Sequence, residues 1–311
     1  GNDAQAWPTR QAPIPAPAIL LSRQRDILGA VQPPNPPMPP ISFEFFPPKT
    51  DEQREQLERA ATQLRRWKPE YVSVTFGAGG STLSYTPETI ARLRDVHGYD
   101  AAPHLSCMGG TRAEIKDLLD RYVAAGVRRI VALRGDMPSG MATSGDFRYA
   151  SDLVRFVREQ ADGAFRIEVA CYPEVHPQAD DARADLENFK RKVEAGADGA
   201  ITQYFFNPDA YFRFVDDARR AGITVPIVPG IMPISNYAQL RRFSESCGAE
   251  IPRWIAKRLA AYADDVQGIG EFGADVVASM CRRLVAGGAP SLHVYTLNRA
   301  KATVALLERV A

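Results

Sequence analysis

The sequence predicts an α/β fold, a (β/α)8 TIM barrel with extra helices before the last strand. From residue 41 onward, short apolar runs alternate with longer amphipathic stretches, and most runs are spaced by roughly thirty residues, the length of one β-loop-α unit. Because the runs are almost wholly apolar and helical stretches follow them, we expect a parallel sheet covered on its outer face. Eight such units imply closure into a barrel. The candidate strands are ISFEFFP (41–47), YVSVTF (71–76), APHLSC (102–107), RRIVALRG (128–135), RIEVACYP (166–173), GAITQYFF (199–206), TVPIVPGI (224–231) and SLHVYTLN (291–298).

The stretches between the runs have helical periodicity. Residues 51–66 and 113–125 each place four apolar or aromatic side chains on one face at a spacing of three or four. The stretches 113–125 and 181–195 stop before Gly126 and Gly196, which suit the C-cap position because glycine adopts the left-handed conformation without strain. Each stretch therefore predicts a helix.

The interval 232–290 is longer than the others and predicts two or three extra helices, including 236–245 and 252–262. No stretch with the composition of a linker divides residues 41–311. A chain of 311 residues suits one barrel, so we expect a single catalytic domain over 41–311.

Residues 1–40 form a proline-rich N-terminal arm with ten prolines. Such composition favours a flexible or polyproline segment outside the fold, and a partner-docking motif is the alternative. Residues 22–31 predict a short helix capped by Ser22. The apolar patch 18–21 is too short for a signal sequence or a membrane span.

Composition excludes several classes of function. The 38 basic and 37 acidic residues give a net charge of +1, which argues against nucleic acid and membrane surfaces as partners. The four cysteines form no C-x-x-C pair, so reduced thiols in a cytoplasmic protein are expected. The four histidines show no zinc-site spacing, and we expect no metal.

Glu44 is the polar residue that most strongly indicates catalysis, because it sits in an apolar run between aromatic residues. An outward-facing position on an alternating strand is the ordinary alternative. An unpaired carboxylate is costly to bury, and burial favours the protonated acid, which suits a general acid.

Other polar residues fall at strand ends, where barrel enzymes keep their catalytic groups. The triplet Arg134-Gly135-Asp136 ends one run and indicates a ligand loop. The glycine-rich stretch 77–81 suits either a phosphate cradle or a plain turn, and it matches neither a P-loop nor a dinucleotide fingerprint. Other residues have ordinary structural interpretations when each is taken alone. Single histidines such as His104 and His176 are more often structural than functional. Asp185 and Lys192 fit the solvated face of a helix, and Phe243 fits a hydrophobic core.

Two other classes of function remain in view. A barrel lyase or aldolase would need a Schiff-base lysine at a strand end, and none of the eight runs ends in one. A binding module would depend on the proline-rich arm alone.

The ordered motifs of residues 41–311 resemble the methylenetetrahydrofolate reductase family, in its short bacterial form. The segments that carry the resemblance are SFEFFPPK (42–49), VSVTFGAGGS (72–81), APHLSC (102–107), RRIVALRGD (128–136), YPEVHPQA (172–179), KRKVEAGADGAITQYFF (190–206), PIVPGIMPISN (226–236) and HVYTLNRA (293–300).

The resemblance implies reduction of 5,10-methylenetetrahydrofolate to 5-methyltetrahydrofolate through non-covalent FAD, which NADH or NADPH reduces in a ping-pong cycle. Glu44 matches the family's general acid, and Asp136 matches the aspartate beside flavin and folate, where its negative charge would stabilise a developing cation. No local motif distinguishes NADH from NADPH as the electron donor. The alternatives are another electron donor, or an enzyme that runs in the oxidative direction. We also expect a homo-oligomer, although no pattern identifies its interface.

The resemblance also implies two sets of binding residues. The FAD set comprises Thr75, Ala78, His104, Arg134, Gly135, Asp136, Tyr149, Ala150, Tyr172, His176, Asp185, Asn188, Arg191 and Lys192. The folate set comprises Glu44, Gln203, Gln239, Phe243, Tyr295 and Arg299, with Phe243 as the aromatic that stacks on folate or nicotinamide. The turn after Gly77-Ala78 and the stretch 138–147 depart from the family's pattern, which puts the flavin contacts there in doubt.

Overall fold

The structure is a computed structural model that describes residues 38–76, 85–106, 110–135, 145–161 and 163–311. All of them belong to one compact unit, Pro36–Ala311. The other unit, Gly1–Asn35, lies outside the described residues, and so does the helix predicted at 22–31.

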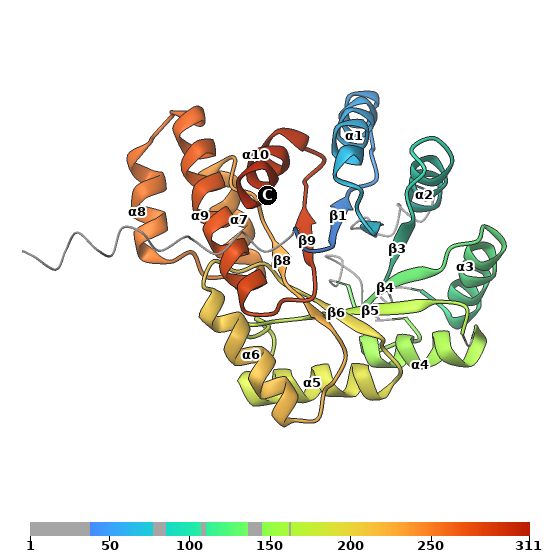
Figure 1. Ribbon diagram of the computed structural model, residues 1–311. Coiled ribbons are helices and arrows are strands. Elements are labelled where there is room, and N and C mark those ends of the chain that lie inside the picture. The colour runs from blue at the N-terminus through green and yellow to red at the C-terminus, as the bar shows by residue number, and fades with distance from the viewer. Residues whose placement is uncertain (1–37, 77–84, 107–109, 136–144, 162) are drawn as a thin grey trace, which may run out of the picture. The chain divides into compact units, whose positions relative to one another are not determined.

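The described residues form a barrel of parallel strands, which confirms the predicted fold class (Figure 1). Every strand pairing is parallel, and the sheet order is β7-β6-β5-β4-β3-β2-β1-β9-β8. The strands are β1 (Ile41–Phe45), β2 (Tyr71–Val74), β3 (Ala101–Ser106), β4 (Arg129–Leu133), β5 (Arg166–Cys171), β6 (Gly199–Thr202), β7 (Ile227–Val228), β8 (Gly230–Ile231) and β9 (Leu292–Tyr295).

The seventh predicted run, 224–231, closes the ring as two short strands on either side of Pro229. β7 pairs with β6, and β8 pairs with β9, so the two ends of the sheet are consecutive pieces of one chain. Proline has no N–H group to continue a ladder, which explains the interruption. Its carbonyl still accepts from the N–H of His293 at 3.1 Å, and the N–H of Gly230 donates to the Thr202 hydroxyl at 2.9 Å.

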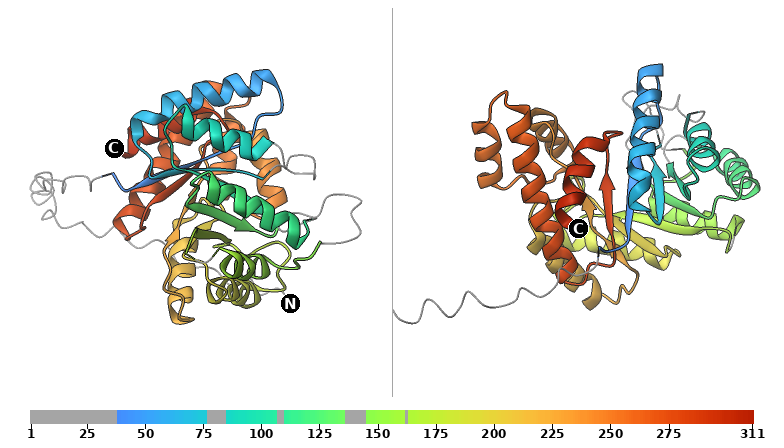
Figure 2. Two further views of the ribbon diagram at one scale, coloured as in Figure 1. Left: turned by 90° about the vertical axis from the view of Figure 1, so that its right-hand side faces the viewer. Right: turned by 45° about the horizontal axis from the view of Figure 1, so that its top comes forward.

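Helices surround the strands, as Figures 1 and 2 show. Three of them, α7, α8 and α9, lie between β8 and β9, in agreement with the two or three extra helices predicted there. The helices predicted at 51–66, 113–125 and 181–195 are present as α1 with a short 3-10 turn (Arg65–Trp67), α3 and α5. The bounds are α1 (Asp51–Leu64), α2 (Tyr85–Asp95), α3 (Arg112–Ala124), α4 (Ala150–Gln160), α5 (Ala182–Glu194), α6 (Pro208–Arg220), α7 (Tyr237–Cys247), α8 (Arg253–Ala261), α9 (Val266–Ala286) and α10 (Ala300–Val310).

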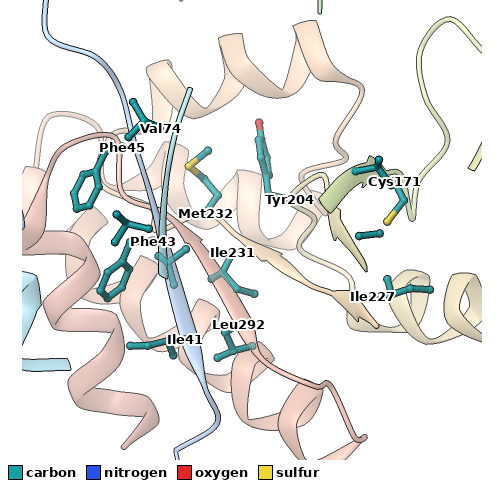
Figure 3. Close-up of a cluster of buried hydrophobic side chains, with 14 of the residues drawn as sticks. Ile41, Phe43, Phe45, Val74, Cys171, Tyr204, Ile227, Ile231, Met232 and Leu292 are labelled. Atoms are coloured by element: carbon teal, nitrogen blue, oxygen red, sulfur yellow. The ribbon is translucent and has the colours of Figure 1, made fainter. Parts of the chain in front are cut away.

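Strand alternation separates the core from the site. Phe43 and Phe45 on β1 are fully buried, and the Phe45 ring lies 6.4 Å from that of Tyr99, whose hydroxyl donates to Ala61 of α1. These phenylalanines therefore belong to the apolar layer beneath the helices, part of which Figure 3 shows. Because successive side chains point to opposite faces, Ser42 and Glu44 take the barrel interior.

A charged cluster fills the N-terminal end of the barrel. Glu168 is almost fully buried and accepts from Arg129 at 2.7 Å and from Arg166 at 2.8 Å, and both arginines stand at the first positions of their strands. The Arg129 guanidinium also lies 4.0 Å from the centre of the Tyr71 ring. Gly199 faces this cluster, and a Cβ there would come within 2.1 Å of a Glu168 carboxyl oxygen. The cluster closes this end, so a ligand site belongs at the carboxyl ends of the strands.

No helix in the described ranges has the length and apolar character needed to cross a membrane. The described cysteines, Cys171, Cys247 and Cys281, are free thiols, and Cys107 lies outside the described residues.

Gly230 should be indispensable to the closure of the barrel. A Cβ at this position would lie 2.2 Å from the Thr202 carbonyl oxygen and 2.7 Å from the Tyr295 ring. We expect Gly230→Ala to lower the free energy of unfolding by about 2 kcal/mol or more, because a backbone carbonyl cannot move aside cheaply. Urea unfolding followed by circular dichroism measures this change.

Gly270 in α9 is the matched control, since a Cβ there meets nothing within 4 Å. Gly270→Ala should be neutral or stabilise by about 0.5–1 kcal/mol, the usual gain from replacing a helical glycine. Equal effects of the two substitutions would contradict the packing argument.

Candidate active site

Glu44 lies near the carboxyl end of β1, and its side chain is 12% exposed. β1 is held between β2 and β9, with Glu44 opposite Ser73 on one side and Tyr295 on the other. The backbone carbonyl of Glu44 accepts from the Thr296 hydroxyl at 2.6 Å and from the Thr296 N–H at 3.3 Å. The interior-facing carboxyl group is thus carried on a backbone that two strands and the following loop restrain.

Two buried histidines face the Glu44 carboxyl group. The Nε2 atoms of His104 and His293 lie 3.4 Å and 3.7 Å from the same oxygen, Oε2. Neither Nε2 atom has a hydrogen-bond partner among the described residues. Burial lowers the pKa of His104, against the opposing effect of the Glu44 charge, so His104 is neutral at neutral pH. The site therefore pairs a carboxyl group with an uncharged imidazole.

The loop after β9 ties the ends of β1 and β9 together. The N–H of Phe46 donates to the Asn298 side-chain oxygen at 2.8 Å, and the Asn298 amide donates back to the Phe46 carbonyl at 3.0 Å. Leu297 and Asn298 both have positive φ, 52° and 54°, in the left-handed region that asparagine tolerates better than most residues. Sequence reasoning missed Thr296 and Asn298 as supports of Glu44.

A cavity of about 610 Å³ opens at the ends of β4 and β5 and along α4 and α5. It brings together most of the residues predicted to bind FAD. Those that line it are Arg134, Gly135, Tyr149, Ala150, Tyr172, His176, Asp185, Asn188, Arg191 and Lys192.

The loop after β5 shapes one wall of this cavity. Val175 has a φ of 70°, an uncommon and strained conformation for a β-branched residue. The N–H of the next residue, His176, donates to the Asp185 carboxylate at 2.9 Å, and the His176 ring packs edge-on against Tyr172 with centroids 4.5 Å apart. Asp185, buried on α5, therefore holds the loop against the helix.

Positive charge and free donors converge on the cavity. The half-buried Lys192 ammonium donates to the Ala170 carbonyl at 2.6 Å. Burial lowers the pKa of Lys192, while the nearby Asp185 acts in the opposite direction. Ala150 and Ser151 begin α4 beside the cavity, and the preceding Tyr149 provides no side-chain cap for their N–H groups. A helix N-terminus with a partly desolvated cation suits an anionic group such as phosphate.

Two predicted cofactor residues, Ala78 and Asp136, lie outside the described residues. Two others, His104 and Thr75, are described but are not among the residues that line this cavity. His104 lies against Glu44 instead. The N–H of Thr75 donates to the Phe45 carbonyl at 3.0 Å, which places Thr75 beside the end of β1.

Among the residues predicted to bind folate, Gln239 and Arg299 are close together, because the Arg299 guanidinium donates to the Gln239 side-chain oxygen at 3.3 Å. Phe243 lies one turn after Gln239 on α7 and is partly buried against the core. The Tyr295 hydroxyl donates across the barrel to the Thr202 carbonyl at 2.7 Å. The Gln203 side-chain oxygen accepts from the N–H of Tyr204 at 3.0 Å, and its role in ligand binding stays a prediction.

Sequence reasoning also missed residues of the cavity wall. Gln178 accepts a hydrogen bond from Arg134, and Asp152 and Arg155 extend the lining along α4. Gln178 lies within the segment 172–179 that carries the resemblance, so its position was the available signal. Asp152 and Arg155 lie on an ordinary amphipathic helix, which offered none.

A parallel barrel with its polar residues at the carboxyl ends of the strands defines this chain as a barrel enzyme. Comparison with known proteins makes the class specific. The model of the methylenetetrahydrofolate reductase family matches residues 35–311. The chain belongs to this family and is an oxidoreductase, a methylenetetrahydrofolate reductase.

Two curated relatives and one solved structure illustrate the similarity. The 5,10-methylenetetrahydrofolate reductase of Escherichia coli (strain K12) is 44% identical over 266 residues, covering 86% of this chain and 88% of the relative. Methylenetetrahydrofolate reductase (NADH) 1 of Arabidopsis thaliana is 38% identical over 280 residues, covering 86% of this chain and 47% of that protein. A Clostridium thermocellum protein solved with two copies of 5-methyl-5,6,7,8-tetrahydrofolic acid aligns at a TM-score of 0.62 and 16% identity, over 88% of this chain and 94% of its own, which supports the shared fold.

Proposed function

We propose that this chain reduces 5,10-methylenetetrahydrofolate to 5-methyltetrahydrofolate with FAD as cofactor and NADH or NADPH as electron donor. The observation that carries the proposal is the nearly buried Glu44 carboxyl group, which faces two histidines where the barrel strands end. A largely buried carboxyl group at a strand end is well placed to act as a general acid toward a substrate nitrogen.

The cavity beside α4 and α5 fits FAD. Its volume of about 610 Å³ lies within the usual range for cofactor sites. The Lys192 ammonium has a lowered pKa because its charge is poorly solvated, and an anionic diphosphate nearby would compensate that charge. The N–H groups at the start of α4, for which the Tyr149 side chain provides no acceptor, add donors for the same group. Arg134 and Arg191 would supply further cationic contacts.

Glu44 would act on the folate. Opening the five-membered ring of 5,10-methylenetetrahydrofolate requires a proton on nitrogen and produces a 5-iminium cation that accepts hydride. Glu44 supplies the proton, and Asp136, which lies outside the described residues, is proposed to stabilise the cation by its negative charge. When bound, FAD would take a hydride from the dinucleotide and pass it to this cation in a ping-pong cycle.

The folate would lie among Gln203, Gln239, Phe243, Tyr295 and Arg299. Arg299 suits a substrate carboxylate because its guanidinium presents paired donors, and Gln239 already orients it. Phe243 offers an aromatic face for the pterin or the nicotinamide. An alternative electron donor, or operation in the oxidative direction, would use the same residues.

Glu44→Gln should separate the two half-reactions. The amide cannot supply the proton, so we expect flavin reduction by dinucleotide to continue and folate reduction to fall by several orders of magnitude. Anaerobic stopped-flow absorbance of the flavin measures each half-reaction separately.

Glu58→Gln is the matched control, because Glu58 is also paired with a buried histidine, His97, at 2.8 Å, but on α1 outside the barrel. This variant should keep both rates. Normal folate turnover by Glu44→Gln would refute the assignment of Glu44.

Lys192→Met should weaken FAD binding by about tenfold or more, because it removes the charge-assisted contact to the diphosphate. The stability of the flavin-free protein should be maintained or increased, since the lowered pKa of Lys192 indicates a charge that is costly to bury. Fluorescence titration with FAD and thermal unfolding measure the two effects.

Lys190→Met on the same helix is the control, because the Lys190 side chain is 37% exposed, lies 3.9 Å from Glu194 and is absent from the cavity lining. It should bind FAD as the wild type does. Equal losses from the two lysine substitutions would show that net charge, and not the position of Lys192, governs binding.

A further inference from the structure

A chain of buried polar side chains leads from the barrel core to Glu44. Ser42 and His293 lie opposite each other on β1 and β9 and are 1% and 0% exposed. The Ser42 hydroxyl is hydrogen-bonded to His293 Nδ1 at 2.7 Å, and Tyr71 lies opposite Ser42 on the other side, on β2. The Tyr71 and His293 rings stack with centroids 6.0 Å apart. His293 is thus held on one nitrogen and one ring face.

The other nitrogen of His293 points to the site. Its Nε2 atom is buried, has no hydrogen-bond partner among the described residues, and lies 3.7 Å from Glu44 Oε2. Burying a polar atom without a hydrogen-bond partner costs free energy. We therefore infer that Nε2 of His293 serves the Glu44 carboxyl group, toward which it is directed. A small movement of the Glu44 side chain, or one bridging water, would complete this contact.

We propose that His293 is a positioning residue for Glu44, and that Ser42 holds it in the tautomer with hydrogen on Nε2. When Ser42 donates to Nδ1, the ring hydrogen must be on Nε2, where it faces Glu44. Once Glu44 has given its proton to the folate nitrogen, its carboxylate accepts the hydrogen bond from Nε2–H. No bond to His293 breaks in this step.

This inference rests on the proposed function, because it concerns the protonation of Glu44 during folate reduction. The other titratable groups that face Glu44 are His104 from β3 and Tyr295 from β9, and Tyr71 from β2 lies against the His293 ring. Burial raises the pKa of both tyrosines, so they remain neutral at working pH. Burial lowers the pKa of His104, which stays uncharged at neutral and alkaline pH. The quantity compared between variants is the pH at which the folate rate falls on the alkaline side, the alkaline limb of the profile.

Three variants test the proposal: His293→Leu, His293→Gln and Ser42→Ala. The measurement is the single-turnover rate at which methylenetetrahydrofolate reoxidises the reduced flavin, recorded from pH 6 to 10, together with the rate of flavin reduction by dinucleotide. His293→Leu should lower the plateau of the folate rate by about tenfold or more, with flavin reduction unchanged within about twofold.

The pH profile gives the sign of the effect. A hydrogen bond donated to a carboxylate favours its ionised form, so loss of this bond should raise the pH at which the folate rate declines. The alkaline limb of His293→Leu should move upward by roughly one pH unit. Ser42→Ala should shift it in the same direction by less, and His293→Gln should recover most of the rate, because its amide N–H can reach the position of Nε2.

His97→Gln is the control, because it changes a histidine that is also buried and also paired with a glutamate, outside the barrel. It should leave the folate rate and pH profile unchanged. A wild-type profile in both His293→Leu and Ser42→Ala, or a shift to lower pH, would overturn the proposal. If His293→Leu fails to fold, the pH profiles of His293→Gln and Ser42→Ala still test the proposal. Failure of the proposed function would appear differently, as a wild-type protein whose reduced flavin the folate does not reoxidise.

Discussion

The parallel pairing of β1 with β9 is the constraint on which the site depends. It joins the first and last strands of the barrel, which are separated by about 250 residues of sequence, and sets Ser42 beside His293 and Glu44 beside Tyr295. The contacts of Thr296 with the Glu44 carbonyl and of Asn298 with Phe46 continue this pairing into the loops. A catalytic carboxyl group must be held in one orientation toward the substrate. These backbone and loop contacts fix the position of β1, and so they limit the orientations that the Glu44 side chain can adopt.

The buried glutamates at the two ends of the barrel have different partners. At the N-terminal end, Glu168 is neutralised by Arg129 and Arg166, and the cluster serves to close the barrel. At the other end, the basic groups within 4 Å of Glu44 among the described residues are two imidazoles, those of His104 and His293. Glu168 is therefore fixed by two arginine ion pairs, whereas Glu44 has neither an arginine nor a lysine partner among the described residues. This contrast explains why two glutamates inside one barrel differ in what they can do.

The sequence predicted much of this structure, and the failures have physical causes. The eight apolar runs and the helices between them follow from local periodicity, and Glu44 was conspicuous as a charge in an apolar strand. The interruption of the strand at Pro229 could not be predicted from the apolar run, because such a run indicates where a strand lies but not where its hydrogen bonds stop. The Ser42–His293 contact and the placement of His104 against Glu44 depend on strand register across the barrel, which no single segment encodes. The cofactor set came from resemblance, and most of its described members do line one cavity.

We propose that this barrel carries electrons from a nicotinamide dinucleotide to methylenetetrahydrofolate through a bound flavin. The most direct test is the visible spectrum of the purified protein under anaerobic conditions, with NADH, then NADPH, then methylenetetrahydrofolate added in turn. We expect a flavin spectrum that at least one dinucleotide bleaches and the folate restores. A protein that shows no flavin spectrum even after FAD is supplied, or whose bleached flavin the folate leaves unchanged, would contradict the claim.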